Sequence, residues 1–123
     1  MANIASRFIL TGVVFALIGM PLGIWMGIEQ DFENRHLHAH INLIGWVAMM
    51  LFGLVYRAYP EAAHTVLARI HYWVALLGAL LFLPGIHLAQ SAQFLPPVIF
   101  GSLLTLLSMI LFAVAIWRAR NTA

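Results

Sequence analysis

With 123 residues the chain has length for one domain, and 63% of its residues are hydrophobic and 8% charged, whereas a soluble domain is about half apolar and about a quarter charged. The absence of cysteine excludes disulfides, thiolate metal sites, iron–sulfur clusters and cysteine nucleophiles, and leaves histidine as the strong ligand for a transition metal. The high apolar content and low charge indicate a membrane protein. In such a protein the net charge of +2 reflects how the loops are distributed between the two sides of the membrane, and gives no basis for nucleic-acid binding.

Four apolar segments follow one another along the chain, and each is long enough to cross a bilayer as a helix, for which about 20 mainly apolar residues suffice. The first, residues 8–28, carries no charge and is too long for the apolar core of a signal peptide. The second ends at Tyr59, because Pro60 disfavours helical backbone in the residue before it. The fourth contains Pro96 and Pro97 in its first turn, where a missing N–H group is tolerated best. The predicted spans are 8–28, 37–59, 65–88 (starting at Thr65 or at Ile70) and 94–117.

Positive charges are unevenly distributed between the two sides of the predicted membrane. The arginines before the first span, around the second loop and after the fourth span are Arg7, Arg57, Arg69, Arg118 and Arg120. Basic residues accumulate on the cytoplasmic side, so both termini are predicted to be cytoplasmic in a multi-pass protein of the cytoplasmic (inner) membrane. The predicted fold class is an all-α integral membrane protein of four helices, with one transmembrane domain over residues 1–123 and the lipid bilayer as its surroundings.

A histidine cluster stands at the outer end of the second span, in NRHLHAHINLIGWVAMM, residues 34–50. At about 100° per residue, His38 and His40 point to opposite sides of the helix, whereas His36 and His40 share a face one turn apart. Either His36 and His40 bind one ion together, or His38 and His40 serve two separate sites. Imidazoles that are only hydrated or hydrogen-bonded to neighbouring helices are the alternative, but ionisable groups in membranes are costly and tend to mark function.

The segments LHAHINLIGWVAMMLFGLVYRAYP and LARIHYWVALLGALLFLPGIHLA resemble the second and third helices of the catalytic subunit (subunit I) of heme–copper oxidases and nitric oxide reductases. The likeness covers residues 8–88 and, more loosely, the fourth span; the histidine motif with Gly45 and Trp46 is its most specific part. In that family a histidine in this setting is an axial ligand of the low-spin heme, so the resemblance assigns His38 to heme b. It implies electron transfer or oxygen or nitric oxide chemistry and, if the chain is an enzyme, an oxidoreductase of the heme–copper oxidase type.

The resemblance also implies how several chains would combine. The family subunit has three successive four-helix arcs, about twelve helices in all, and identical chains commonly close into rings. A later family helix carries a His-X-His pair whose members serve two different hemes, and HAH at residues 38–40 has the same spacing. A homotrimer is therefore expected, in which His38 of one protomer and His40 of the next flank a heme at each interface. The copper-binding histidines of the family lie on helices with no counterpart here.

The residues predicted to bind heme b are His38, His40, Arg35, Trp25 and Asn42, with Arg35 and Trp25 at the outer level where heme propionates need polar or cationic groups. His87 lies at the same level and is a candidate third ligand, propionate partner or helix cap. The candidate metal ligands are His36, His38, His40 and His87, with copper considered beside heme as a cofactor. An accessory protein that binds or transports copper or zinc is the alternative function, and a structural subunit without a cofactor is a third. No redox partner is identified by the sequence.

Other polar groups carry less weight in the prediction. His71 and His87 are separated by about 24 Å of helix and cannot share one ion within a chain. The carboxylates all lie at the ends of predicted spans or in loops, at Glu29, Asp31, Glu33 and Glu61. Because none of them lies inside a span to form a proton relay, no proton pumping by the single chain is predicted.

Overall fold

A computed structural model of the protein describes residues 3–121, and the regular elements in that range are all helices. They are α1 (Ile4–Glu29), the run of α2 (Arg35–His40), η1 (Ile41–Ala48) and α3 (Met49–Ala58), the short α4 (Pro60–Ala63), α5 (Val66–Ala92) and α6 (Pro96–Ala119). Four helical segments are long and apolar enough to cross a membrane, which confirms the predicted all-α fold with four spans. Their ends lie within four residues of the predicted ones. The predicted domain also includes residues 1–2 and 122–123, which lie outside the described residues.

Side-chain caps determine where two of the spans begin. The Asn3 side chain accepts a hydrogen bond from the backbone N–H of Ser6 at 2.8 Å, and the Thr65 hydroxyl accepts one from the N–H of Ala68 at 3.1 Å. Short polar side chains at this position satisfy N–H groups that the first helical turn leaves free. Of the two predicted starts of the third span, the structure therefore selects Thr65, the residue immediately before α5.

The second span is not a uniform α-helix. Its middle part, η1, is a π-helix, in which each N–H bonds to the carbonyl group five residues before it and the turn is wider than in an α-helix. The angular spacing used to orient the histidines therefore holds up to His40 and changes after it. Gly45, within η1, packs against Phe15 of α1, where an added Cβ atom would lie 2.6 Å from Cγ of the ring. The wide turn thus includes a close backbone approach to α1.

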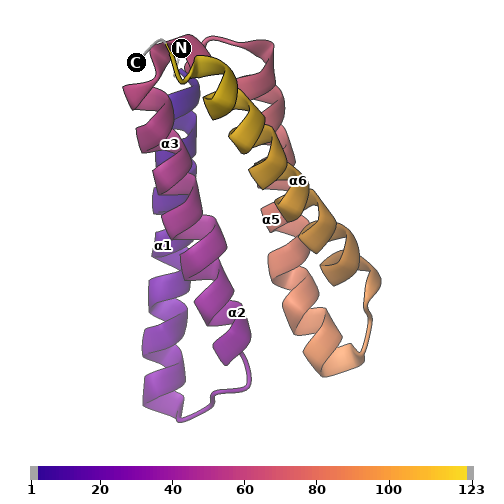
Figure 1. Cartoon of the computed structure of the whole chain (residues 1–123). Coiled ribbons are helices and arrows are strands. Elements are labelled where there is room, and N and C mark those ends of the chain that lie inside the picture. Colours follow the sequence, from indigo (N-terminus) through magenta and orange to yellow (C-terminus); the bar gives the residue numbers. More distant parts are fainter. Residues whose placement is uncertain (1–2, 122–123) are drawn as a thin grey trace.

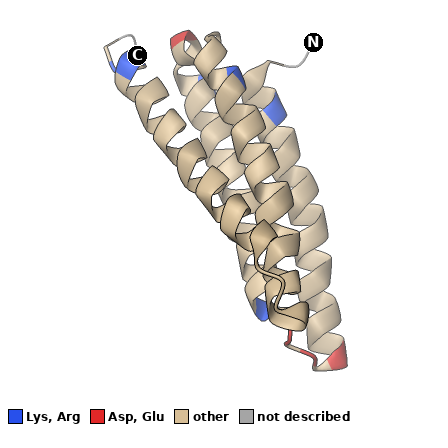
Figure 2. Ribbon diagram, turned by 90° about the vertical axis from the view of Figure 1, so that its right-hand side faces the viewer, with Lys and Arg blue, Asp and Glu red and all other residues tan. Residues whose placement is uncertain are grey.

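The four spans form two antiparallel hairpins (Figure 1). In one hairpin α1 packs against η1 and α3, and in the other α5 packs along α6. The hairpins meet at the end that holds α4 and both ends of the described chain, which we call the termini end. The helix axes of the two hairpins diverge toward the opposite end, which is formed by α2 and the loops at 30–34 and 93–95 and which we call the histidine end. Contacts between α2 and α5 still link the hairpins there. Charged residues gather at these two ends and leave the length between them uncharged (Figure 2).

Aromatic rings from all four spans meet near the termini end. Members of this aromatic cluster are Phe8, Phe52, Tyr56, His71, Tyr72 and Phe112. His71 is fully buried, and its Nδ1 atom lies 2.8 Å from the Tyr56 hydroxyl. Within the described part of the chain, His71 Nε2 is the buried side-chain nitrogen that has no hydrogen-bond partner. The bond to Tyr56 is therefore the hydrogen bond that holds this imidazole in the core.

Replacing Tyr56 with Phe should lower the free energy of unfolding by about 1–3 kcal/mol, because the buried Nδ1 atom of His71 would lose its partner while the ring packing is kept. The measurement is the midpoint of thermal unfolding in detergent micelles. Tyr59→Phe is the matched control, since the structure gives the Tyr59 hydroxyl no hydrogen bond. An equal midpoint for the two variants would contradict the importance assigned to the bond.

Candidate functional site

The three clustered histidines lie in α2 at the histidine end. His36 is exposed, whereas His38 and His40 are half-buried. α2 begins after Asn34 and continues directly into η1. The histidines therefore occupy the short α-helical stretch between the loop at 30–34 and the π-helix, where α2 contacts α5 of the other hairpin.

His38 is held against α1 by one well-defined hydrogen bond. Its Nδ1 atom lies 2.8 Å from the carbonyl oxygen of Gly19. Because a carbonyl group only accepts, Nδ1 carries the proton and the lone pair of the neutral ring is on Nε2. The Asn42 amide donates to the carbonyl oxygen of His38 at 3.0 Å. Its 3.3 Å approach to Nδ1 is not a second bond, since both nitrogens carry hydrogen.

Gly23 of α1 makes room for this imidazole, and Gly19 makes room for the neighbouring Asn42 side chain. A Cβ atom added at Gly23 would lie 2.5 Å from Cε1 and 3.0 Å from Nε2 of His38, and one added at Gly19 would lie 2.9 Å from Oδ1 of Asn42. Gly27, one turn further along α1, has no atom within 4 Å of the equivalent position. Gly23 thus forms a cradle in which the ring of His38 lies directly against the backbone of α1.

His40 faces the other hairpin. Its ring lies 5.5 Å from that of Phe82 in α5, at an interplanar angle of 83°. Its Nδ1 atom donates to the carbonyl oxygen of His36 at 2.7 Å, which again leaves the lone pair on Nε2. His38 on the α1 side and His40 on the α5 side lie on opposite sides of α2, as the helical spacing predicts.

His87 joins the site from α5. Its Nδ1 atom donates to Oδ1 of Asn34 at 2.8 Å, so the ring ties α5 to the start of α2 and does not cap its own helix. It borders a groove of about 520 Å³ between the two hairpins, whose other lining side chains are apolar, among them Phe15, Leu37 and Leu83. His87 is the one polar side chain of this groove, and its Nε2 atom also has its lone pair free.

Arg35 and Trp25, the other predicted site residues, lie at the same end but, within the described part of the chain, do not contact the three histidines through a hydrogen bond. Arg35 donates from Nη1 to the backbone carbonyl of Phe32 at 3.1 Å, within its own loop. Trp25 is 46% exposed on α1. Over residues 3–121, no three His, Asp or Glu side chains come close enough to hold one metal ion. His36, His40 and His87 therefore do not form a three-ligand metal centre within one chain.

Sequence reasoning identified these histidines as candidates but did not identify the residues that they contact. The Gly19 carbonyl, the Gly23 cradle and Asn34 lie on other segments of the chain, and their contacts depend on how the helices pack. Glycines four residues apart on a helix do signal a close neighbour. The sequence alone does not say that the neighbour is an imidazole.

Comparisons with known proteins agree with the resemblance seen in the sequence. The chain is 33% identical over 99 residues to the cbb3-type cytochrome c oxidase subunit CcoN1 of Stutzerimonas stutzeri, covering 71% of this chain and 21% of that subunit. It is 31% identical over 111 residues to the alternative cytochrome c oxidase subunit 1 of Bradyrhizobium diazoefficiens, covering 76% of this chain and 19% of that subunit. The chain thus spans about a fifth of the length of these relatives. No family model and no solved structure matches. The chain is distantly similar to heme–copper oxidase subunit I over that part.

The close contact between Gly23 and His38 predicts the effect of an alanine side chain at position 23. Gly23→Ala should displace the imidazole and break its bond to Gly19, because real Cβ contacts are not as short as 2.5 Å. The measurement is ¹⁵N NMR of histidine-labelled protein in micelles, in which the slowly exchanging Nδ1–H signal of His38 should disappear. Gly27→Ala is the control and should leave the signal in place. Survival of the signal in the Gly23 variant would show that the ring does not depend on the cradle.

Proposed function

We propose that the chain binds heme b at the histidine end and transfers electrons in the membrane. The observation that carries this proposal is the state of His38, His40 and His87. Each donates from Nδ1 to an oxygen atom of the protein, at 2.8, 2.7 and 2.8 Å. A hydrogen bond from one ring nitrogen to a protein oxygen orients the imidazole and makes its other ring nitrogen a better metal ligand. The donor set fits heme iron, whose axial positions neutral imidazoles fill.

The surroundings of the histidines also suit a large apolar cofactor. The groove beside Leu37 and Ile41 is lined by apolar side chains from both hairpins, and exposed apolar residues such as Ile24 and Ile28 flank the site on α1. Arg35 and Trp25 are available at the exposed rim for propionates, and Asn42 positions His38 through its carbonyl group. When bound, heme supplies a one-electron iron couple whose potential the axial ligands and their hydrogen bonds adjust.

We assign the two axial ligands to neighbouring chains of a homotrimer. His38 and His40 lie on opposite sides of α2, so one chain offers a heme one of these two ligands. A ring of three chains would supply the second and cover apolar surface that is exposed in the single chain. Two histidine ligands leave iron without a vacant position, which favours electron transfer over oxygen or nitric oxide chemistry. The proposal includes the inner membrane as location, with the termini end in the cytoplasm.

The first test is the absorption spectrum of the purified protein and of His38→Ala. The wild type should show a Soret band and a sharp reduced α band of low-spin heme, and the variant should retain at least about tenfold less heme, since even indirect changes at such ligands cost 10- to 100-fold. His64→Ala, at the termini end, is the control and should bind heme normally. Unchanged heme content in His38→Ala would overturn the assignment. A colourless protein with stoichiometric copper or zinc would favour the accessory metal-binding function.

The second test asks whether a heme takes its ligands from two chains. His38→Ala and His40→Ala proteins should each lose heme, but co-expression should restore about a quarter of the sites, because random assembly of a closed ring places an intact His38 beside an intact His40 at one interface in four. Native mass spectrometry should show three chains with up to three hemes. A monomer that keeps six-coordinate heme would refute the shared site and point to His36 or His87 as the second ligand.

A further inference from the structure

A polar cavity, which we call the Arg7–Arg69 cavity, lies at the termini end, far from the histidine cluster. It has a volume of about 370 Å³ and lies between the first turn of α1 and the start of α5. Its polar lining consists of Asn3 and Arg7 from α1, His64 and Thr65 from the turn after α4, and Arg69 from α5. No carboxylate lines it. Two arginines that are distant in sequence thus share one cavity without an acidic partner.

Two other arginines at the termini end have partners within the chain. Arg57 donates to the Ser6 hydroxyl at 3.0 Å. Arg120 donates to the carbonyl oxygen of Trp117, and its guanidinium lies 3.9 Å from the centre of that ring. Within residues 3–121, by contrast, Arg7 and Arg69 form neither a hydrogen bond through their side chains nor an ion pair. Their donors remain available to a ligand.

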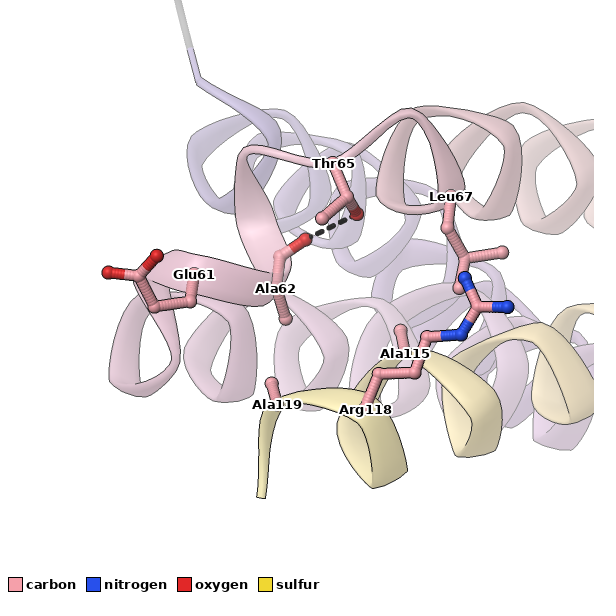
Figure 3. Close-up of a pocket in the computed structure, with 7 residues that line it drawn as sticks. All are labelled: Glu61, Ala62, Thr65, Leu67, Ala115, Arg118 and Ala119. Carbon is pink, nitrogen blue, oxygen red and sulfur yellow. Dashed lines mark hydrogen bonds between the residues drawn. The ribbon is translucent and has the colours of Figure 1, made fainter. Parts of the chain in front are cut away.

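Glu61, the acidic residue of the termini end, belongs to a different cavity. That cavity has a volume of about 140 Å³ and contains Arg118. Figure 3 shows the Glu61 carboxylate pointing away on one side and Arg118 reaching beside Leu67 on the other. The Thr65 hydroxyl, which borders both cavities, is already bonded to the carbonyl oxygen of Ala62 at 2.7 Å. The carboxylate of Glu61 therefore does not balance the positive charge of the Arg7–Arg69 cavity.

The two helices that carry the arginines are fixed together directly beneath the cavity. Thr11, one turn after Arg7, is hydrogen-bonded to the hydroxyl of Tyr72 at 2.8 Å, and Tyr72 packs edge-on against the buried ring of Phe8. Both helices also begin at this cavity, so the positive ends of their dipoles add to the charge of the arginines. The two cationic sides of the cavity thus belong to helices that are hydrogen-bonded to each other one turn deeper.

We propose that this cavity binds the phosphate group of an anionic phospholipid. Guanidinium groups match phosphate oxygens with paired hydrogen bonds, and basic pockets between helix ends suit lipid head groups. Leu10 and Trp73 lie one turn deeper on the faces that carry Arg7 and Arg69, and are 60% and 52% exposed. They provide an apolar surface for acyl chains directly below the charged cavity, which a soluble phosphate would not need.

The test measures lipid retention by the full chain with native mass spectrometry from detergent. Phosphatidylglycerol should bind at one molecule per chain more tightly than phosphatidylcholine. The double variant Arg7→Gln with Arg69→Gln should weaken binding of phosphatidylglycerol at least about tenfold, whereas Arg118→Gln with Arg120→Gln, which removes the same charge from the same end, should weaken it less than about twofold. The variant pair Arg7→Lys with Arg69→Lys keeps the charge and should give an intermediate loss, because lysine lacks the paired donors.

Three results would overturn the proposal. Equal retention by the Arg7 and Arg69 variants and the wild type would show that the cavity does not bind the lipid. Equal losses in the two glutamine pairs would indicate general charge attraction. Competition by inorganic phosphate at the concentration of the lipid would assign the cavity to a soluble anion. Helical circular dichroism checks that each pair folds, and if the glutamine pair does not, the lysine pair replaces it against Arg118→Lys with Arg120→Lys.

Discussion

Hydrocarbon offers no hydrogen bonds, so polar groups within the spans must find partners in the protein. In α6 this is done locally, since Ser102, Thr105 and Ser108 each donate to a carbonyl group three or four residues before them. Bonds between spans are few and therefore determine where the helices meet. Tyr56 with His71 and Thr11 with Tyr72 join the hairpins near the termini end, and His87 with Asn34 joins them at the histidine end.

Between these two ends the hairpins are held together mainly by van der Waals packing of apolar side chains. Apolar side chains fill most of the space, but a groove of about 520 Å³ remains between α1, η1 and α5 on the histidine side. Hydrophobic burial is weak as a driving force between helices in lipid, so close packing and a few polar bonds supply most of the specificity. A chain built in this way has strong contacts at its ends and accessible space beside its histidines.

Hydropathy predicted the four spans because crossing a bilayer requires a long apolar helix whatever the tertiary contacts. Local chemistry also placed the start of α5, where Thr65 caps the first turn. The opposite directions of His38 and His40 followed from α-helical spacing, which holds within α2. The bond from His38 to the Gly19 carbonyl could not be predicted, because hydropathy does not determine how one helix rotates against another. The burial of His71 in an aromatic cluster depends on the same rotation.

The π-helix between the histidines and the core sets the phase of the second span. An eight-residue segment with wider turns advances by a smaller angle per residue than an α-helix, so the faces of α2 and α3 do not continue one another. α3 is anchored by Phe52 and Tyr56 in the aromatic cluster, whereas α2 is anchored by the bond from His38 to α1. η1 therefore sets the rotation of α2 relative to α3 about their common helix axis, while both helices are anchored by their contacts. Were it to rewind into an α-helix with α3 held in place, the histidines would swing around the helix axis and His38 would leave the surface of α1.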